Sequence, residues 1–235
     1  MASEELKIFT NEEFQSEDIE FSRRTFFGSA IKSRFIRCNI HLNPKGIPAY
    51  RDGSRFLISQ CVFEDCSVTA IGKLKALDFT HAVKIHRCRF TGGSLVEAKF
   101  GAEGIEAPSE PWVKDCDFSA VDLRDVRFYQ TQTESVVLPT WPFITAVAQE
   151  NGVIFAAPSL RRPALTLLLD EVSDFDWEDL PLQRAMESLV FGVGLKSTQA
   201  SIQVCHAEDV IKRGAGSMER LRTALERFAH PAIRY

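Results

Sequence analysis

The cysteines and histidines are the residues most suited to redox, nucleophilic or metal chemistry. No CxxC pair occurs, and no histidine stands at ligand spacing from a cysteine, so the patterns of zinc sites are missing. A chain of 235 residues with six cysteines is also too sparse in them for a secreted disulfide scaffold. We therefore expect free, buried thiols and no metal site. The six are Cys38, Cys61, Cys66, Cys88, Cys116 and Cys205.

Catalytic patterns are missing as well. The five histidines are scattered, and none belongs to a nucleophile or zinc motif. His86 follows Ile85, and we expect it to be a solvated surface residue. The segment FGVGLKST (191–198) lacks the GxxxxGK[ST] spacing of a phosphate-binding loop. We predict that the protein is not an enzyme, has no catalytic residue and needs no cofactor.

Two acidic clusters are candidates for binding, at residues 4–20 and within DEVSDFDWEDL. In the second, Phe175 and Trp177 alternate with carboxylates, a composition suited to docking on a basic surface with aromatic anchors. The alternative interpretation is a solvated face with acidic residues at a helix start. Partner-binding candidates are Asp170, Glu171, Asp174, Phe175, Asp176, Trp177, Glu178 and Asp179, together with Tyr50 and Arg51.

The charge is distributed unevenly along the chain. The net charge is −4, yet residues 1–20 carry seven acidic residues against one lysine, and residues 21–143 carry 17 basic against 13 acidic residues. This balance excludes a nucleic-acid binder of the usual basic kind. No apolar run is long enough to span a membrane, and the acidic N-terminus does not fit a secretory signal. We expect a cytoplasmic protein.

A five-residue period runs through the first two thirds of the chain. Between residues 111 and 130, Val113, Phe118, Leu123 and Phe128 stand five apart, and a small or apolar residue precedes each by two positions. Neither a helix nor an ordinary strand gives this period. The same phase recurs upstream and downstream. The predicted core residues are Phe35, Cys38, Ile40, Ile58, Cys61, Phe63, Cys66, Val68, Ile85, Cys88, Phe90, Leu95, Phe100, Val113, Cys116, Phe118, Leu123, Phe128, Leu138 and Phe143.

The segments CDFSA and VDLRD, with CRFTG, CVFED and CNIHL, resemble the motif of the pentapeptide-repeat family. The resemblance implies a mainly β solenoid, a right-handed quadrilateral β-helix with four pentapeptides per coil. Stacking of coils would create the core, because one coil cannot bury its own apolar residues. The repeats would cover residues 20–143 of a domain at 1–145, with the segment from Phe21 to Ile31 as a distorted first coil.

Three segments break the period and are expected to be loop insertions, near residues 42–55, 69–76 and 101–111. When these are allowed for, Cys38, Cys61, Cys88 and Cys116 fall in one inward column that Val136 continues. We expect this column to be a ladder of small apolar residues.

Residues 146–235 have helical patterning and predict a small helical domain that covers the open end of the β-helix. Asp179 is the expected N-cap of one helix and Ser217 of the last. Residues 195–205 fit a strand or an extended link. The apolar face of the last helix serves equally for covering the end or for pairing two chains, so the protein is expected to be a monomer or a homodimer.

The function expected by elimination and charge is a non-enzymatic inhibitor that binds a protein. The first hypothesis is an immunity protein that neutralises a bacterial toxin, such as a nuclease. The second follows from the family resemblance: binding and protection of DNA gyrase or another topoisomerase by imitation of DNA, which the basic balance of residues 21–143 disfavours. A structural adaptor is the third. In each case the partner is a protein (a toxin or a nucleic-acid-processing enzyme), without direct nucleic-acid binding.

Overall fold

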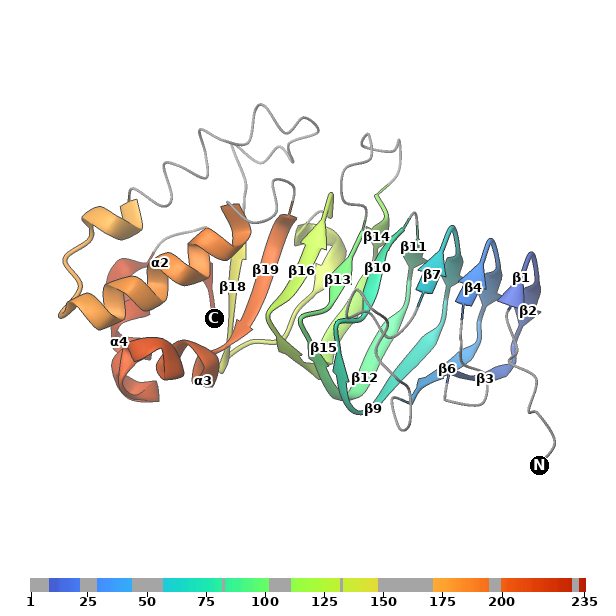
Figure 1. Ribbon diagram of the computed structural model, residues 1–235, viewed down its shortest axis with the longest axis horizontal. Helices are drawn as coiled ribbons and strands as arrows, with labels where there is room; N and C mark the ends of the chain where they lie inside the picture. The colour runs from blue at the N-terminus through green and yellow to red at the C-terminus, as the bar shows by residue number, and fades with distance from the viewer. Residues whose placement is uncertain are drawn as a thin grey trace.

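The computed structural model describes residues 9–21, 29–43, 57–81, 83–101, 111–131, 133–147, 171–194, 200–229 and 233–235. The molecule is elongated, with stacked strands towards the N-terminus and the helices gathered at the other end (Figure 1). In the described residues, no helix combines the length and the apolar character needed to cross a membrane.

The chain visits three sheets in fixed rotation and then returns to the first, and we call each such circuit a round. Within the rounds, neighbouring strands of a sheet are parallel. The first sheet begins with β1 (Phe9–Thr10), β4 (Ser29–Ile31), β7 (Leu57–Ser59), β10 (Asp78–His81), β13 (Lys99–Phe100) and β16 (Val126–Tyr129). The second contains β2 (Glu13–Gln15), β5 (Arg34–Ile36), β8 (Val62–Glu64), β11 (Lys84–His86) and β14 (Val113–Lys114). The third contains β3 (Asp18–Phe21), β6 (Asn39–Leu42), β9 (Ser67–Lys75), β12 (Arg89–Val96), β15 (Cys116–Arg124) and β17 (Val136–Val137).

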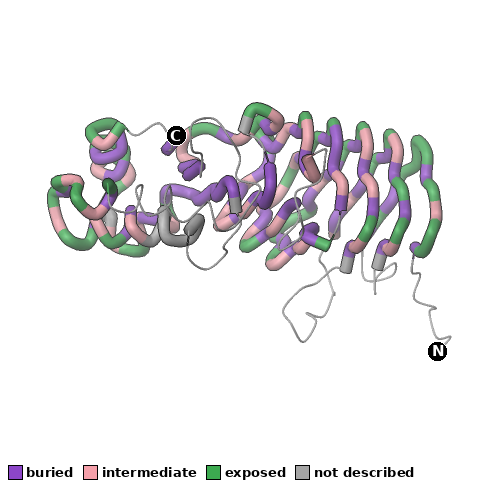
Figure 2. The backbone as a smooth tube through the Cα atoms, turned by 90° about the horizontal axis from the view of Figure 1, so that it is seen from above, coloured by how far each residue is buried: buried purple, intermediate pink, exposed green. Residues whose placement is uncertain are grey.

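The five-residue period places one large side chain of each short strand inside the stack, and two of each long strand β9, β12 and β15. Equivalent rings of successive rounds lie face to face: the centroids of Phe35 and Phe63 are 4.8 Å apart, and those of Phe90 and Phe118 are 4.4 Å apart. Figure 2 shows the resulting alternation of buried and exposed residues along the rounds. Every predicted core residue is buried except Leu138 and Phe143, which are partly buried and pack against the core.

The corners between strands depend on left-handed backbone. The residue two positions after the large inward residue has a positive φ, as in Asp65 (φ 55°) after Phe63 and Arg87 (φ 53°) after Ile85. This conformation costs an L-residue about 1–2 kcal/mol. It directs the amide of the corner residue at the next round, so that Asp65 N donates to His86 O at 3.0 Å. Each round is thereby bonded to the next at its corners as well as along its strands.

The cysteine column differs from the expected one. Ser67 N donates to Cys38 O and Arg89 N to Cys66 O, so Cys66 stands between Cys38 and Cys88 in the ladder that Cys116 and Val136 continue. Cys61 belongs to a different column, because Val62 N donates to Ser33 O. The prediction was wrong on this point because Cys61 follows β7, a strand of the first sheet, whereas Cys38 precedes β6, a strand of the third sheet. All six thiols are free and buried, as expected.

The segment 69–76 is not the expected loop, because β9 runs through it. Leu74 is buried as the counterpart of Leu95 and Leu123, so the long strands of the third sheet turn a corner and line two sides of the core. The spacing from Val68 to Leu74 is six residues rather than five, and the extra residue is absorbed by a shift of register against β12. A Cβ on Gly93 would lie 1.9 Å from Gly72 O, so glycine permits the close approach here. The other two expected insertions fall largely outside the described residues.

The stack also begins earlier than residue 20. Phe9, Phe14 and Ile19 stand five apart and are buried, and β1, β2 and β3 pair with β4, β5 and β6. The acidic residues around them obscured the period in the sequence. Part of the expected distorted coil from Phe21 to Ile31 lies outside the described residues.

The C-terminal region, which we call the cap, contains strands as well as helices, and the strand or extended link expected at 195–205 is confirmed in its described part by β19. The first sheet continues through β19 (Ala200–His206), β18 (Phe143–Val147) and β20 (Ile233–Arg234), which are antiparallel. The expected boundary at 145/146 lies inside β18. Because β19 pairs directly with β16, backbone hydrogen bonds cover the edge of β16, and the first sheet continues into the cap.

Helices pack against these strands and form a second core. They are α2 (Leu180–Gly194), α3 (Ala207–Val210), the π-helical turn η2 (Ile211–Ala215) and α4 (Met218–Phe228); a short turn η1 (Thr133–Ser135) precedes β17. Both expected caps are confirmed: Asp179 Oδ1 accepts from Leu182 N at 2.9 Å, and Ser217 Oγ accepts from Arg220 N at 3.2 Å. Strands and helices meet in this core through Ile144, Met186 and Leu225.

Candidate functional site

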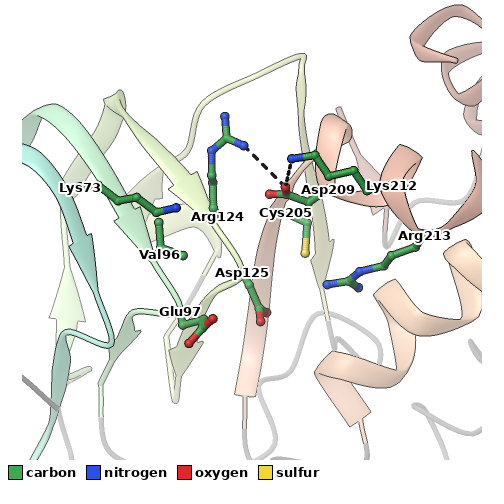
Figure 3. A pocket seen from close by; sticks show the side chains of 9 residues that line it. All are labelled: Lys73, Val96, Glu97, Arg124, Asp125, Cys205, Asp209, Lys212 and Arg213. Atoms are coloured by element: carbon green, nitrogen blue, oxygen red, sulfur yellow. Dashed lines mark hydrogen bonds and ion pairs between the residues drawn. The ribbon is translucent and has the colours of Figure 1, made fainter. Parts of the chain in front are cut away.

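A charged groove of about 370 Å³ lies where the stack meets the cap (Figure 3). One wall comes from the third sheet, and the other comes from β19, α3 and η2. Its lining consists of Lys73, Val96, Glu97, Arg124, Asp125, Cys205, Asp209, Lys212 and Arg213.

Arg124 is the centre of an ionic link across this groove. Its Nε donates to Asp122 Oδ2 at 3.0 Å, and its terminal nitrogen lies 3.3 Å from Glu208 Oε2 and 3.6 Å from Asp209 Oδ1. The hydrogen bond to Asp122 is the largest influence that raises the pKa of Arg124 above its usual value. The Arg124 side chain is 24% exposed and that of Glu208 is 54% exposed, so solvent screens this link and its contribution to holding α3 on β15 is modest.

The base of the groove is held in the same way. Asp125 Oδ1 accepts from Gln203 Nε2 at 2.8 Å and lies 3.4 Å from Arg127. Burial raises the pKa of the Cys205 thiol to about 12, which keeps it protonated and poorly nucleophilic. In the described part of the chain, no group of three metal-binding side chains is arranged to hold an ion. The groove therefore ties the stack to the cap through Arg124 and Asp125.

The aromatic residues of the predicted docking segment are structural. Trp177 is 7% exposed, its Nε1 donates to Val172 O at 2.6 Å, and its ring lies 4.7 Å from Phe175 and 5.3 Å from Phe228. The interpretation of Trp177 as an accessible anchor was wrong. The reason lies in the tertiary structure, because α4 brings Phe228 against the segment and the indole of Trp177 packs between the segment and α4.

The carboxylates of this segment fall into two groups. Glu178 and Asp179 contact Arg220 at 2.9 and 2.8 Å. The hydrogen bond from Leu182 N, and then that pairing, hold the pKa of Asp179 below its usual range.

Asp174 and Asp176 are exposed, and neither has an ion-pair partner among the described residues. Glu171 is exposed as well. The candidates Asp170, Tyr50 and Arg51 lie outside the described residues.

His86 is not the expected solvated residue. It is 8% exposed, and its Nε2 lies 3.0 Å from Pro111 O, a carbonyl that can only accept. The ring is covered because the next round of the second sheet begins at Pro111. The imidazole is therefore a packed hydrogen-bond donor to this carbonyl.

The outer face of the second sheet carries an ion-pair network that we did not expect. Arg87 contacts both Glu64 and Asp65, and Arg34 lies 3.6 Å from Glu13 and 4.0 Å from Glu64. The sequence signal was present as opposite charges one round apart, but it becomes visible only when the rounds are aligned.

Comparison of the sequence with protein-family models and with curated proteins finds no match to either.

Proposed function

We propose that the stack is a right-handed quadrilateral β-helix of pentapeptide-repeat type. The five-residue spacing of the inward side chains, the fixed rotation through three parallel sheets and the fourth side lined by Leu74, Leu95 and Leu123 support this assignment. Backbone hydrogen bonds join each described round to the next, which favours a stiff scaffold.

We further propose that the protein is a non-enzymatic inhibitor that binds another protein through the cap, and that its partner is a bacterial toxin. The observation that carries this proposal is the display of Asp174 and Asp176 on a segment that Trp177 pins to α4. Because the packing of Trp177 holds the backbone that carries these carboxylates, the segment loses little backbone freedom on binding, which favours affinity.

A nuclease toxin suits this surface best. The active site of a nuclease is basic because it receives phosphates, and exposed carboxylates complement it in charge. As an immunity protein, the chain would block that site sterically and electrostatically without any chemical step.

Imitation of DNA towards a topoisomerase is the weaker candidate. It requires a continuous negative surface, whereas the described second round carries Lys32, Arg34 and Arg37 and no acidic residue. An adaptor role is the remaining alternative.

The test is capture of partners from a lysate of the protein's own cells, followed by affinity and activity measurements with the purified partner. We expect a toxin whose activity the protein inhibits. Asp174→Lys combined with Asp176→Lys should weaken binding at least about tenfold, or about 1.4 kcal/mol. The control Asp115→Lys reverses an exposed corner carboxylate on the stack and should leave the affinity unchanged.

An unchanged affinity of the double variant for a recovered toxin would refute the cap as the binding surface. Recovery of gyrase subunits instead would favour the topoisomerase candidate.

A further inference from the structure

A small pocket lies between the end of the third sheet and the last two strands of the first sheet. After β17, a turn in which Phe143 N donates to Thr140 O at 3.1 Å returns the chain into β18, and β18 pairs with β20. The pocket between these elements has a volume of about 160 Å³. Val136 and Thr140 bound it on one side, and Thr145 and Arg234 bound it on the other.

Two polar side chains line this pocket without a partner among the described residues. Thr145 and Arg234 stand directly opposite each other in β18 and β20, so their side chains emerge on the same face of the sheet. Thr145 is 3% exposed, yet its hydroxyl makes no hydrogen bond within the described part of the chain. Buried hydroxyls normally have a partner, so this one is available to a ligand. Arg234 is exposed and forms no ion pair with any described residue.

The other walls of the pocket are mainly apolar. Val136 and Pro139 are buried, Leu138 packs against the core of the stack, and Tyr235 packs against the core of the cap. A cavity of about 150 Å³ is enough to hold benzene, so this pocket has room for one aromatic ring. The ring of Tyr235 favours an aromatic occupant over an aliphatic one, because aromatic pairs gain from stacked or edge-to-face contact.

The polar groups select the charge of the occupant. Arg234 is the one charged side chain among the described residues that line the pocket, and a guanidinium remains positive at any ordinary pH. Its parallel N–H groups match the two oxygen atoms of a carboxylate. The hydroxyl of Thr145 can donate to the same carboxylate. A cationic ligand would be repelled, and a neutral ring would leave the charge of Arg234 unused.

We propose that this pocket binds small aromatic carboxylates of about the size of benzoate. The ring lies among Leu138, Pro139 and Tyr235, and the carboxylate accepts hydrogen bonds from Arg234 and Thr145. No lining residue belongs to the acidic segment of the proposed function, so this site does not depend on that function.

Benzoate is the probe, and its binding to the full chain is measured by titration followed by methyl NMR. Benzamide keeps the ring but lacks the negative charge, whereas acetate keeps the charge but lacks the ring. We expect benzoate to bind with a dissociation constant of about 1 mM or lower, and at least about tenfold more tightly than either control compound. Nuclear Overhauser contacts from its ring to the methyl groups of Val136, Leu138 and Thr145 should locate it.

Two variants separate the roles of the polar groups. Arg234→Gln should weaken benzoate about tenfold and leave benzamide unchanged, because only the charged ligand uses the guanidinium. The matched control Arg37→Gln removes an exposed arginine of the second round and should leave both affinities unchanged. Thr145→Val keeps the shape of the side chain but removes the hydroxyl, so it should weaken benzoate about threefold. Urea unfolding should show no loss of stability in Thr145→Val, because removal of this hydroxyl breaks no hydrogen bond with a described residue.

The proposal would be overturned by the absence of saturable benzoate binding up to about 10 mM, or by equal affinities for benzoate and benzamide. Ligand contacts elsewhere on the protein, or an undiminished affinity of Arg234→Gln, would also overturn it. The same holds for a captured partner protein whose side chain fills the pocket and that benzoate does not displace, since the site would then belong to a protein interface.

Discussion

Replacement of Trp177 tests whether the acidic segment is anchored inside the cap or offers its indole to a partner. The side chain is 7% exposed and contacts two rings, and its Nε1 satisfies the carbonyl of Val172 at 2.6 Å. Truncation of a buried tryptophan to alanine costs about 3–5 kcal/mol. Loss of the donor also leaves a buried carbonyl unpaired, a penalty of about 1–3 kcal/mol that overlaps with the first. We expect Trp177→Ala to lower the free energy of unfolding by about 4 kcal/mol.

The assay is urea unfolding followed by far-ultraviolet circular dichroism, with hydrogen exchange to show whether the loss is confined to the cap. Trp177→Phe keeps an aromatic ring but loses the donor, so it should cost about 1–2 kcal/mol. Asp174→Ala, at an exposed carboxylate, should stay within about 0.5 kcal/mol of the original protein. The reasoning is refuted if Trp177→Ala leaves stability within about 1 kcal/mol while it lowers affinity for a partner, because that is the behaviour of an exposed anchor.

Three further predictions concern the stack and the start of α2. Ala76→Gly, at a corner with φ of 55°, should stabilise the protein by about 0.5–1 kcal/mol, whereas Ala120→Gly in β15 should destabilise it by a similar amount; opposite shifts of the urea midpoint check this. Phe100 is fully buried against four rings, so Phe100→Ala should cost about 3–5 kcal/mol in the same assay, and a cost below about 2 would contradict the packing described. The pKa of Asp179 is lowered in the folded protein, so its ionised form stabilises the fold above about pH 4, and this stabilisation is lost as the pH falls through the lowered value. Asp179→Asn, which still caps the helix, should therefore reduce the loss of stability measured between about pH 4 and pH 2.

The local part of the fold was readable from the sequence because it depends on spacing alone. A large residue every five positions, with a small one two before it, predicts which side chains of the parallel sheets face inward. Phe90, Phe100 and Phe118 are accordingly inside the stack. The caps at Asp179 and Ser217 were predictable for the same reason. The capping side chain and the backbone amide that donates to it are three residues apart.

The alignment of one round with the next could not be predicted from the sequence, because it depends on which residues lie in insertions between the strands. Cys61 was assigned to the wrong column for this reason. An additional residue between Val68 and Leu74 had the pattern of a loop in the sequence, yet the structure absorbs it as a bulge. Only strand pairing decides such points, since the pattern of side chains is equally compatible with neighbouring registers.

By itself the sequence determined most of the inward positions from residue 35 onward, the acidic character of residues 4–20, the free thiols and the helical character of much of the C-terminal region. Tertiary structure alone decided that β19 pairs with β16, that His86 is buried beneath the next round, and that Trp177 belongs to the cap core. The physical reason is the range of the interactions. A period or a cap is set by residues a few positions apart. The burial of a side chain depends instead on a distant segment, as the burial of Trp177 depends on Phe228.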